Sequence, residues 1–495
     1  MDAVRAERRQ KYHEADVVVV GAGIFGCAAA YALANQGRSV ILLERWMHEP
    51  DRIVGELLQP GGCAALRKLG LGHCLEGIDA VPCYGYHIRF HGDEVNFSYP
   101  YTNDHGEVVL QAQKKNGDEF KRPEGRGFHH GRFIMQLRRS CLAHPNITVF
   151  ETDVTNTIVG QTSPEILGVE TRTTVDPNAN EKKQDCFFGK MTIIADGYAS
   201  KFRKQVLGVQ PQVKSRFYAL ELIDPPIQPS GYGHVNIGKA SPVLMYAIGS
   251  HEVRALIDVP LDHPEATPEK GGVRNYINNV VLPTLPREVV PSFQAALADG
   301  KIPKSMPNSW LPPSSQAANP PGILVLGDAM NMRHPLTGGG MTVAFNDVVV
   351  LSELLAPIRN LDDHAAVRAV MQRFHWQRKS LSSIINVLAM ALYSLFAADS
   401  RYLRALRIAC FSYFQRGITE EPTGLLGGLI QRPFVLFRHF FTVAFWAIWL
   451  NGRDVVRSGG MLLGWLKVPL AVWEGFMILW TACVVFLPIM WQEAL

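Results

Sequence analysis

A carboxylate and a glycine triplet form the first group of residues that could do chemistry. Gly327 and Asp328 follow the apolar run 323–326, which is typical of a buried strand, and the triplet Gly338, Gly339 and Gly340 precedes a helical pattern that begins at Met341. Glycines let a ligand approach the backbone, and a helix N-terminus offers free N–H groups with partial positive charge. Asp328 could therefore bind a ribityl or ribose hydroxyl. A tight turn in an α/β sheet would use the same residues.

A second glycine-rich turn contains Gly21, Gly23 and Gly26. It lies between an apolar strand pattern at 16–20 and an alanine-rich helical pattern, and the next strand pattern, at 39–43, ends at Glu44. Glu44 lies about 20 residues after the glycine turn, which is the spacing of an acid that contacts a ribose. Dinucleotide binding is predicted by this order of strand, G-x-G-x-x-G turn, helix, strand and acid. The alternative is a glycine-rich turn with a surface glutamate. An acid rather than a basic residue favours an unphosphorylated ribose, hence FAD or NAD over NADP.

A third strand ends in a carboxylate at Asp196. The apolar run 191–194 precedes it, and Asp196, Ser200 and Arg203 form a D-G-x-x-S-x-x-R pattern. Carboxylates at the ends of parallel strands meet at one edge of a sheet, so Asp196 is a further candidate for the ligand site.

The rest of the chain must supply the elements that position these residues. With 495 residues it is long enough for two or three domains. The segment 84–101 alternates as an antiparallel sheet would, several short strands are expected over 217–254, and the polar stretch 104–127 is expected to be an exposed loop or insertion. Alternating strand and helix patterns around the glycine turns predict an α/β fold.

Charge and metal-ligand spacing exclude other functions. A net charge of +4 is too small to indicate nucleic-acid binding, and the eight scattered cysteines form no C-x-x-C pair, which is typical of reduced thiols. The adjacent His129 and His130 do not have metal-ligand spacing on a helix, so no metal site is expected.

Together the three sites resemble the FAD-dependent monooxygenases of the para-hydroxybenzoate hydroxylase type. Longer runs narrow the resemblance to the squalene epoxidase family; these runs are 51–62, 128–135, 311–315 and 331–341. The short N-terminus resembles that of the fungal members of the family. The resemblance implies a Rossmann-like FAD-binding domain with an inserted mixed β-sheet substrate domain and a C-terminal helical membrane-associated region. The expected boundaries are 14–46, 129–197 and 327–362 for the FAD-binding domain, 47–128 and 198–326 for the substrate domain, and 363–495 for the C-terminal region.

The resemblance also assigns individual residues. It implies FAD contacts at Ile24, Glu44, Arg45, Arg52, Arg138, Val154, Asp328 and Met341. It further implies that Tyr86 and Gln59 lie together over the flavin, beside a substrate channel. Spacing alone would favour a core tyrosine at position 86.

The composition changes after residue 362 in a way that indicates membrane attachment. The segment 433–450 holds five Phe and two Trp, and 475–492 is an eighteen-residue run without charge. A membrane-spanning helix needs about 20 apolar residues, and Pro488 interrupts the last of these runs. We therefore expect helices that lie in one leaflet of the membrane. A single C-terminal span and a soluble oily subdomain are the alternatives.

The implied reaction is epoxidation of squalene to (S)-2,3-epoxysqualene with O2, in ergosterol-type sterol biosynthesis. The chain shows one dinucleotide fingerprint, so reducing equivalents are expected from outside, and the resemblance implies NADPH-cytochrome P450 reductase as the donor. The expected location is the cytosolic face of the endoplasmic reticulum membrane, with lipid droplets as a further site. A membrane-bound FAD-dependent reductase of isoprenoid chains and a non-catalytic prenyl-lipid carrier are the alternative functions.

Overall fold

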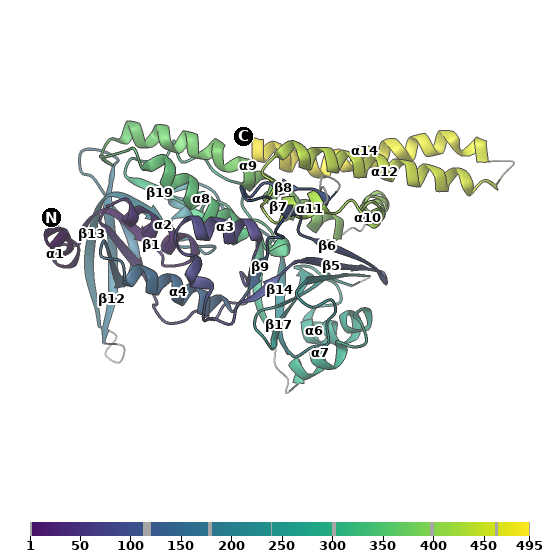
Figure 1. Ribbon diagram of the computed structural model, residues 1–495, viewed down its shortest axis with the longest axis horizontal. Helices are drawn as coiled ribbons and strands as arrows, with labels where there is room; N and C mark the ends of the chain where they lie inside the picture. Colours follow the sequence, from purple (N-terminus) through teal and green to yellow (C-terminus); the bar gives the residue numbers. More distant parts are fainter. Residues whose placement is uncertain are drawn as a thin grey trace.

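The structure, a computed structural model, describes residues 2–111, 120–176, 181–238, 240–298, 303–396, 400–460 and 464–494. In these residues two seven-stranded sheets lie side by side, and a layer of C-terminal helices runs along one side of both (Figure 1). The predicted α/β fold with a mixed sheet and a helical C-terminal region is confirmed.

The first sheet has the order β10-β2-β1-β13-β12-β11, with β19 paired to β13. Its strands are β1 Glu14–Val20, β2 Val40–Glu44, β10 Ile147–Glu151, β11 Asp153–Val159, β12 Ile166–Asp176, β13 Glu181–Ile194 and β19 Ile323–Val325. Strand β1 lies between β2 and β13, parallel to both, and its valines are buried on either face. This explains the uninterrupted apolar run of the strand, because a central parallel strand is covered on both sides.

Helices α2 Ile24–Asn35, α3 Pro60–Lys68, α4 His130–Leu142 and α8 Gly340–Leu355 pack around the first sheet, and α1 Asp2–Lys11 lies at its edge. The short helix α5 Arg203–Leu207 contacts β19. Strand β19 lies in the range assigned to the substrate domain but belongs to the first sheet, and α3 packs against α8. The chain therefore returns to the first sheet before residue 327.

The second sheet has the order β18-β14-β17-β16-β15-β5-β6. Its strands are β5 Gly85–Phe90, β6 Asp93–Ser98, β14 Gln212–Ile223, β15 Gly233–Ile237, β16 Val243–Ala247, β17 Glu252–Pro260 and β18 Lys304–Trp310. The predicted antiparallel pairing within 84–101 is confirmed by β5 and β6. Strand β5 also pairs in parallel with β15, which sets Tyr86 opposite Gly233. Helices α6 Gly272–Tyr276 and α7 Val290–Ala296 lie beside this sheet.

Two small sheets contain the remaining strands: β3 Leu57–Leu58, β4 Val81–Cys83 and β9 Gly125–Gly127 in one, β7 Tyr101–Thr102 and β8 Val108–Val109 in the other. The expectation of an exposed loop over 104–127 is therefore wrong at its end, because β9 lies between β3 and β4 with Gly125 and Gly127 buried. A Cβ on Gly127 would lie 2.0 Å from the carbonyl oxygen of Ala247, so this strand needs glycine to approach its neighbour. Residues 112–119 of the expected loop lie outside the described residues.

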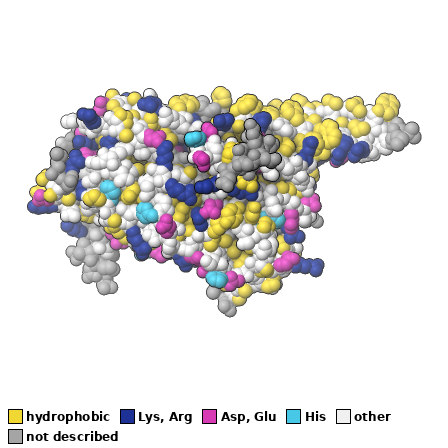
Figure 2. Space-filling view, in the orientation of Figure 1, with side chains coloured by type: hydrophobic (Ala, Val, Ile, Leu, Met, Phe, Trp, Pro, Cys, Tyr) yellow, Lys and Arg dark blue, Asp and Glu magenta, His cyan; other side chains and the backbone are white. Residues whose placement is uncertain are grey.

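The C-terminal helices are α9 His364–Phe396, α10 Arg401–Gln415, α11 Glu420–Leu426, α12 Pro433–Arg457 and α14 Val468–Ala494. By length and composition α9, α12 and the segment Gly464–Glu493 could cross a membrane. Most of the apolar window of α9 is buried within the protein, whereas α12 and α14 pair into a hairpin that projects from the body and is mostly exposed (Figure 1). Apolar side chains cover much of the visible face of this hairpin (Figure 2).

Candidate active site

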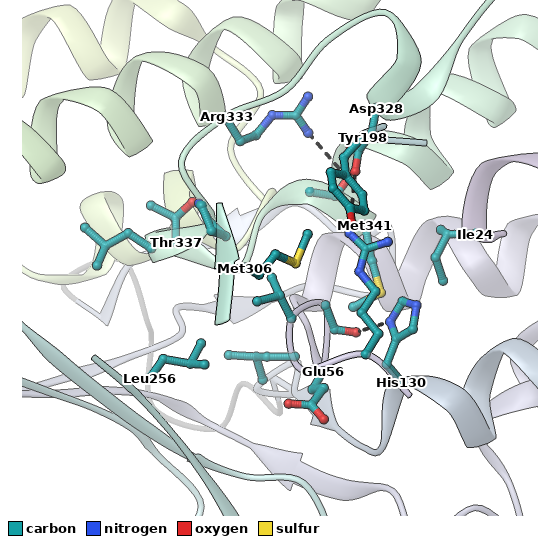
Figure 3. Close-up of a pocket in the computed structure, with 18 of the residues that line it drawn as sticks. Ile24, Glu56, His130, Tyr198, Leu256, Met306, Asp328, Arg333, Thr337 and Met341 are labelled. Atoms are coloured by element: carbon teal, nitrogen blue, oxygen red, sulfur yellow. Dashed lines mark hydrogen bonds and ion pairs between the residues drawn. The ribbon is translucent and has the colours of Figure 1, made fainter. Parts of the chain in front are cut away.

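A large cavity lies between the glycine turns of the first sheet and the face of the second sheet. It encloses about 1460 Å³, part of which is open to solvent. Ile24, Tyr198, Asp328 and His130 lie on one side of it, and Thr337, Met306 and Leu256 lie on the other (Figure 3). The cavity is thus bounded by both expected domains.

Glycines bring bare backbone to the wall of this cavity. Gly21 has φ +100°, and a Cβ there would lie 2.5 Å from the carbonyl oxygen of Ala195; a Cβ on Gly26 would lie 1.8 Å from the carbonyl oxygen of Gly21. These two positions need glycine for the turn itself. A Cβ on Gly23 or Gly340 would meet no atom within 4 Å, and both residues line the cavity. Their missing side chains leave space for a ligand at the start of α2 and of α8.

Glu44, at the end of β2, is held directly beneath the first glycine turn. Its Oε2 accepts a hydrogen bond from the backbone N–H of Ala22 at 2.7 Å and lies 3.3 Å from Nη2 of Arg138. Arg138 is buried, and it also donates from Nε to the carbonyl oxygen of Ala22 at 3.0 Å and from Nη1 to that of Trp46 at 2.9 Å. The two predicted residues therefore fix each other and the turn.

Arg203 joins the Asp196 motif to the Asp328 motif. Its guanidinium donates to the carbonyl oxygens of Gly197, Tyr198, Asp328 and Ala329 at 2.8–3.1 Å. The arginine of the D-G-x-x-S-x-x-R pattern is thus a clamp between two loops. Asp196 accepts from the N–H of Lys201 at 2.9 Å through Oδ2, and burial raises the pKa of this carboxyl above its ordinary value.

Gln59 and Tyr86 meet in a buried hydrogen-bond network. Tyr99 donates its hydroxyl to Oε1 of Gln59 at 2.6 Å, which orients the amide so that Nε2 donates to the hydroxyl of Tyr86 and, at 2.9 Å, to the carbonyl oxygen of Thr337. The Tyr86 hydroxyl donates to the same carbonyl at 3.2 Å. Burial raises the pKa of Tyr86 well above its ordinary value, so the phenol stays protonated at neutral pH.

A second cavity of about 860 Å³ lies beyond this network, under α9, α10 and α11. Aliphatic and aromatic side chains form nearly all of its wall; they include Phe90, Phe97, Leu392, Phe411 and Phe414. Tyr86, Val235, Leu336 and Thr337 line both cavities. These four residues mark the junction between the chamber beside the glycine turns, which has both polar and apolar walls, and a chamber that is almost wholly apolar.

The structure brings part of the predicted site to the first cavity. The predicted residues that line it are Ile24, Arg52, Tyr86, Asp328 and Met341. Nη2 of Arg52 lies 3.9 Å from Oδ2 of Asp328. Gly339 packs tightly, since a Cβ there would lie 2.3 Å from Ile385. Arg45 stacks on Trp46, with 3.7 Å between its guanidinium carbon and the ring centroid, and Val154 is buried in the core of the first sheet.

Several residues of the site were missed by sequence reasoning. Tyr99 and Thr337 complete the Gln59 network, and Arg333 and His130 line the cavity. Arg333 and Thr337 lie in the run 331–341, which is one of the runs that carry the resemblance to the family. Nothing in the residue types or spacing of that run pointed to these two residues individually. His130 donates from Nδ1 to the carbonyl oxygen of Gly55 at 2.8 Å, and burial together with the Arg52 charge lowers its pKa to about 3.

The residues present fit FAD. The open Gly23 and Gly340 positions provide backbone contact, and Glu44 stands where an adenosine ribose is bound in this class of fold. Buried polar atoms near the cavity have no hydrogen-bond partner among the described residues; they are Arg52 Nε, Asp196 Oδ1, Arg333 Nε and Thr337 Oγ1. Buried polar groups are normally paired, so a polar cofactor accounts for donors and acceptors left free here.

Solved structures support the fold. A p-nitrophenol 4-monooxygenase from Pseudomonas putida matches with a TM-score of 0.60 at 17% identity, covering 84% of this chain and 97% of that one. HpxO from Klebsiella pneumoniae, a variant complexed with FAD, matches with a TM-score of 0.58 at 19% identity, covering 84% and 97%. The protein therefore has the fold of FAD-dependent monooxygenases.

Sequence comparisons identify the family. The family model for FAD dependent oxidoreductases matches residues 16–48, and the model for squalene epoxidase matches residues 188–466, more than half of the chain. A squalene epoxidase of Gibberella zeae is 60% identical, covering 99% of this chain and 98% of its own; one of Aspergillus fumigatus is 50% identical, covering 100% and 96%. A squalene monooxygenase of Mus musculus is 38% identical, covering 97% and 78%. The chain therefore belongs to the squalene epoxidase family of FAD-dependent monooxygenases.

Proposed function

We propose that the protein converts squalene to (S)-2,3-epoxysqualene with O2, in ergosterol-type sterol biosynthesis. One oxygen atom of O2 enters the terminal double bond, and the other leaves as water after two electrons and two protons are supplied. We also propose that the electrons come from NADPH through NADPH-cytochrome P450 reductase.

The observation that carries this proposal is the pair of cavities with a common wall. Chemistry on a hydrocarbon requires a dry apolar chamber for the chain and an adjoining site with a few placed polar groups for the cofactor. The second cavity has the apolar wall, the first has the glycines and carboxylates, and Tyr86 and Thr337 belong to both. A hydrocarbon chain lying through the junction would place one end at the cofactor.

Each part of the site has a role in this proposal. Reduced flavin supplies the activation of O2, which no side chain can provide. Gly23, Glu44, Arg138 and Asp328 hold the cofactor, while the network of Gln59, Tyr86 and Tyr99 fixes the junction without a charged group. The apolar wall under α9 and α10 orients the chain and excludes water.

We further propose that the hairpin α12–α14 attaches the protein to the cytosolic face of the endoplasmic reticulum membrane. Trp465, Trp473 and Trp480 are more than half exposed on it, as expected for aromatic side chains at a lipid interface. Arg453 and Arg457 lie near its tip. Moving these charges across a bilayer is unfavourable, so the hairpin lies in one leaflet rather than crossing it.

One assay tests the function and separates the alternatives. Detergent-solubilised protein is supplied with squalene, NADPH and the reductase, with and without O2, and the product is analysed by mass spectrometry. An epoxide formed only with O2 is the expected result. A hydrogenated chain formed without O2 would identify an isoprenoid reductase, and flavin-free protein that binds squalene without turnover would identify a carrier.

A further inference from the structure

A buried polar network joins the last turn of α14 to the wall of the first cavity. Asn386, on α9, donates from Nδ2 to Oε1 of Glu493 at 2.8 Å and to Oδ1 of Asn331 at 3.2 Å. Asn331 Oδ1 also accepts from Nη2 of Arg333 at 2.8 Å, and Arg333 lines the cavity (Figure 3). Three side-chain hydrogen bonds thus connect Glu493 to the cofactor chamber.

Asn331 is the centre of this network, and its orientation is fixed. Its Nδ2 donates to the carbonyl oxygen of Leu311 at 2.8 Å, so its Oδ1 must face the donors on the other side. A third donor, Nη2 of Arg378, reaches the same Oδ1 at 3.1 Å, and Arg378 forms a buried ion pair with Asp347 of α8 at 2.7 Å. The network therefore ties α8, α9 and α14 to the loop that carries Arg333.

The network ends in a cation whose position is set by few contacts. Arg333 is 8% exposed. Its Nη2 donates to Oδ1 of Asn331 at 2.8 Å and to the carbonyl oxygen of the same residue at 3.1 Å, Nη1 reaches the carbonyl oxygen of Gly340 at 3.4 Å, and Nε has no partner among the described residues. Gly340 begins α8, so this guanidinium lies where the helix already favours negative charge. A cation there stabilises the anionic reduced form of a flavin more than the neutral oxidised form.

We propose that Glu493 is a positioning residue that holds Arg333 in place through Asn386 and Asn331, so that the docked C-terminal hairpin tunes the flavin site. Burying a carboxyl group is unfavourable unless it is hydrogen-bonded, so the 3% exposed Glu493 on the largely apolar helix α14 requires a specific partner. The inference rests on the FAD site and not on squalene as the substrate.

Glu474 provides a matched control on the same helix. It is also 3% exposed, and it is bound by Arg401 and by Nδ2 of Asn451 at 2.8 Å, within the hairpin and its neighbour α10. Glu474→Leu and Glu493→Leu remove equally buried carboxylates of α14, but only the second breaks the connection to Arg333. Glu493→Gln keeps an oxygen that can accept from Asn386.

The test measures FAD directly on full-length, detergent-solubilised protein. We expect Glu493→Leu to raise the Kd for FAD about fivefold to tenfold, the effect of one lost buried hydrogen bond of ~1 kcal/mol, and to make the flavin midpoint potential more negative. Glu493→Gln and Glu474→Leu should resemble the wild type in both measurements. Equal effects of the two leucine variants, or no effect of Glu493→Leu, would overturn the proposal.

A double-mutant cycle provides the second measurement if Glu493→Leu folds poorly. Glu493→Ala should weaken FAD binding in the wild-type background but have little further effect in an Arg333→Ala background, because no guanidinium is left to position. Additive effects would show that the two residues act independently and would overturn the proposal. Neither readout depends on epoxidation, so failure of the proposed function would be seen separately, in the squalene assay.

Discussion

Gln59 donates its side-chain amide to the hydroxyl of Tyr86, although the two residues come from different parts of the fold. Gln59 lies at the start of α3, which packs on the first sheet, and Tyr86 lies on β5 of the second sheet. Both also donate to the carbonyl oxygen of Thr337, beside the glycine triplet. One backbone oxygen thus connects the two sheets to the cofactor loop.

The Tyr86 hydroxyl is expected to matter for turnover rather than for folding. Tyr86→Phe keeps the ring and removes one buried hydrogen-bond partner, which costs ~1–3 kcal/mol; if the loss falls on the transition state, epoxidation drops roughly tenfold to a hundredfold. FAD content, measured by absorbance, should stay normal. Tyr276→Phe removes another buried hydroxyl, one bound to Ser241, and should leave turnover unchanged. Wild-type epoxidation by flavin-replete Tyr86→Phe would identify Tyr86 as a packing residue.

Alanine substitutions at the glycines of the first turn are expected to have different effects, one on FAD binding and the other on folding. In Gly23→Ala the new methyl group points into the cavity and meets no protein atom, so the protein should fold but bind FAD at least tenfold more weakly. In Gly26→Ala the methyl group would collide with the carbonyl oxygen of Gly21, so the folded protein itself should be lost. Circular dichroism and flavin titration distinguish the two results. Normal FAD affinity in Gly23→Ala would place the cofactor elsewhere.

The motifs predicted the FAD-binding half of the fold well because its signals are local. Strand, glycine turn and acid lie within residues 14–44, and β1, α2 and β2 appear where the pattern indicated. The parallel pairing of β5 with β15 was not predicted, because it joins segments more than a hundred residues apart and leaves no periodicity in either. Tyr99 was missed for the same reason, since its partner Gln59 comes from another element.

His130 should make the protein less stable in mild acid. Its pKa is lowered from 6.5 to about 3 in the folded state, so between these values the unfolded chain binds more protons and stability falls as the pH falls. At pH 5 the contribution reaches ~2 kcal/mol. His130→Asn retains a donor for Gly55 without the titrating ring, and it should lose less stability than the wild type between pH 7 and pH 5 in thermal unfolding. The exposed His105→Asn serves as the control, and an unchanged pH profile in His130→Asn would contradict the assignment.

Membrane attachment is expected to depend on the exposed aromatic side chains of α14. Trp473 and Trp480 are 58% and 57% exposed and flank Phe476 on one face of the helix. Each should bury on the order of 100 Å² in lipid, or ~2 kcal/mol, so replacing both by Gln should weaken binding to phospholipid vesicles by at least tenfold.

Substituting the two tryptophans is a more specific test than deleting the chain from Pro433, because deletion also removes Glu493 and its contact with Asn386. Trp46→Gln, a change at a similarly exposed tryptophan in the loop after β2, should leave vesicle binding intact. If the double variant floats with vesicles as the wild type does while retaining FAD, attachment lies outside this face of the hairpin.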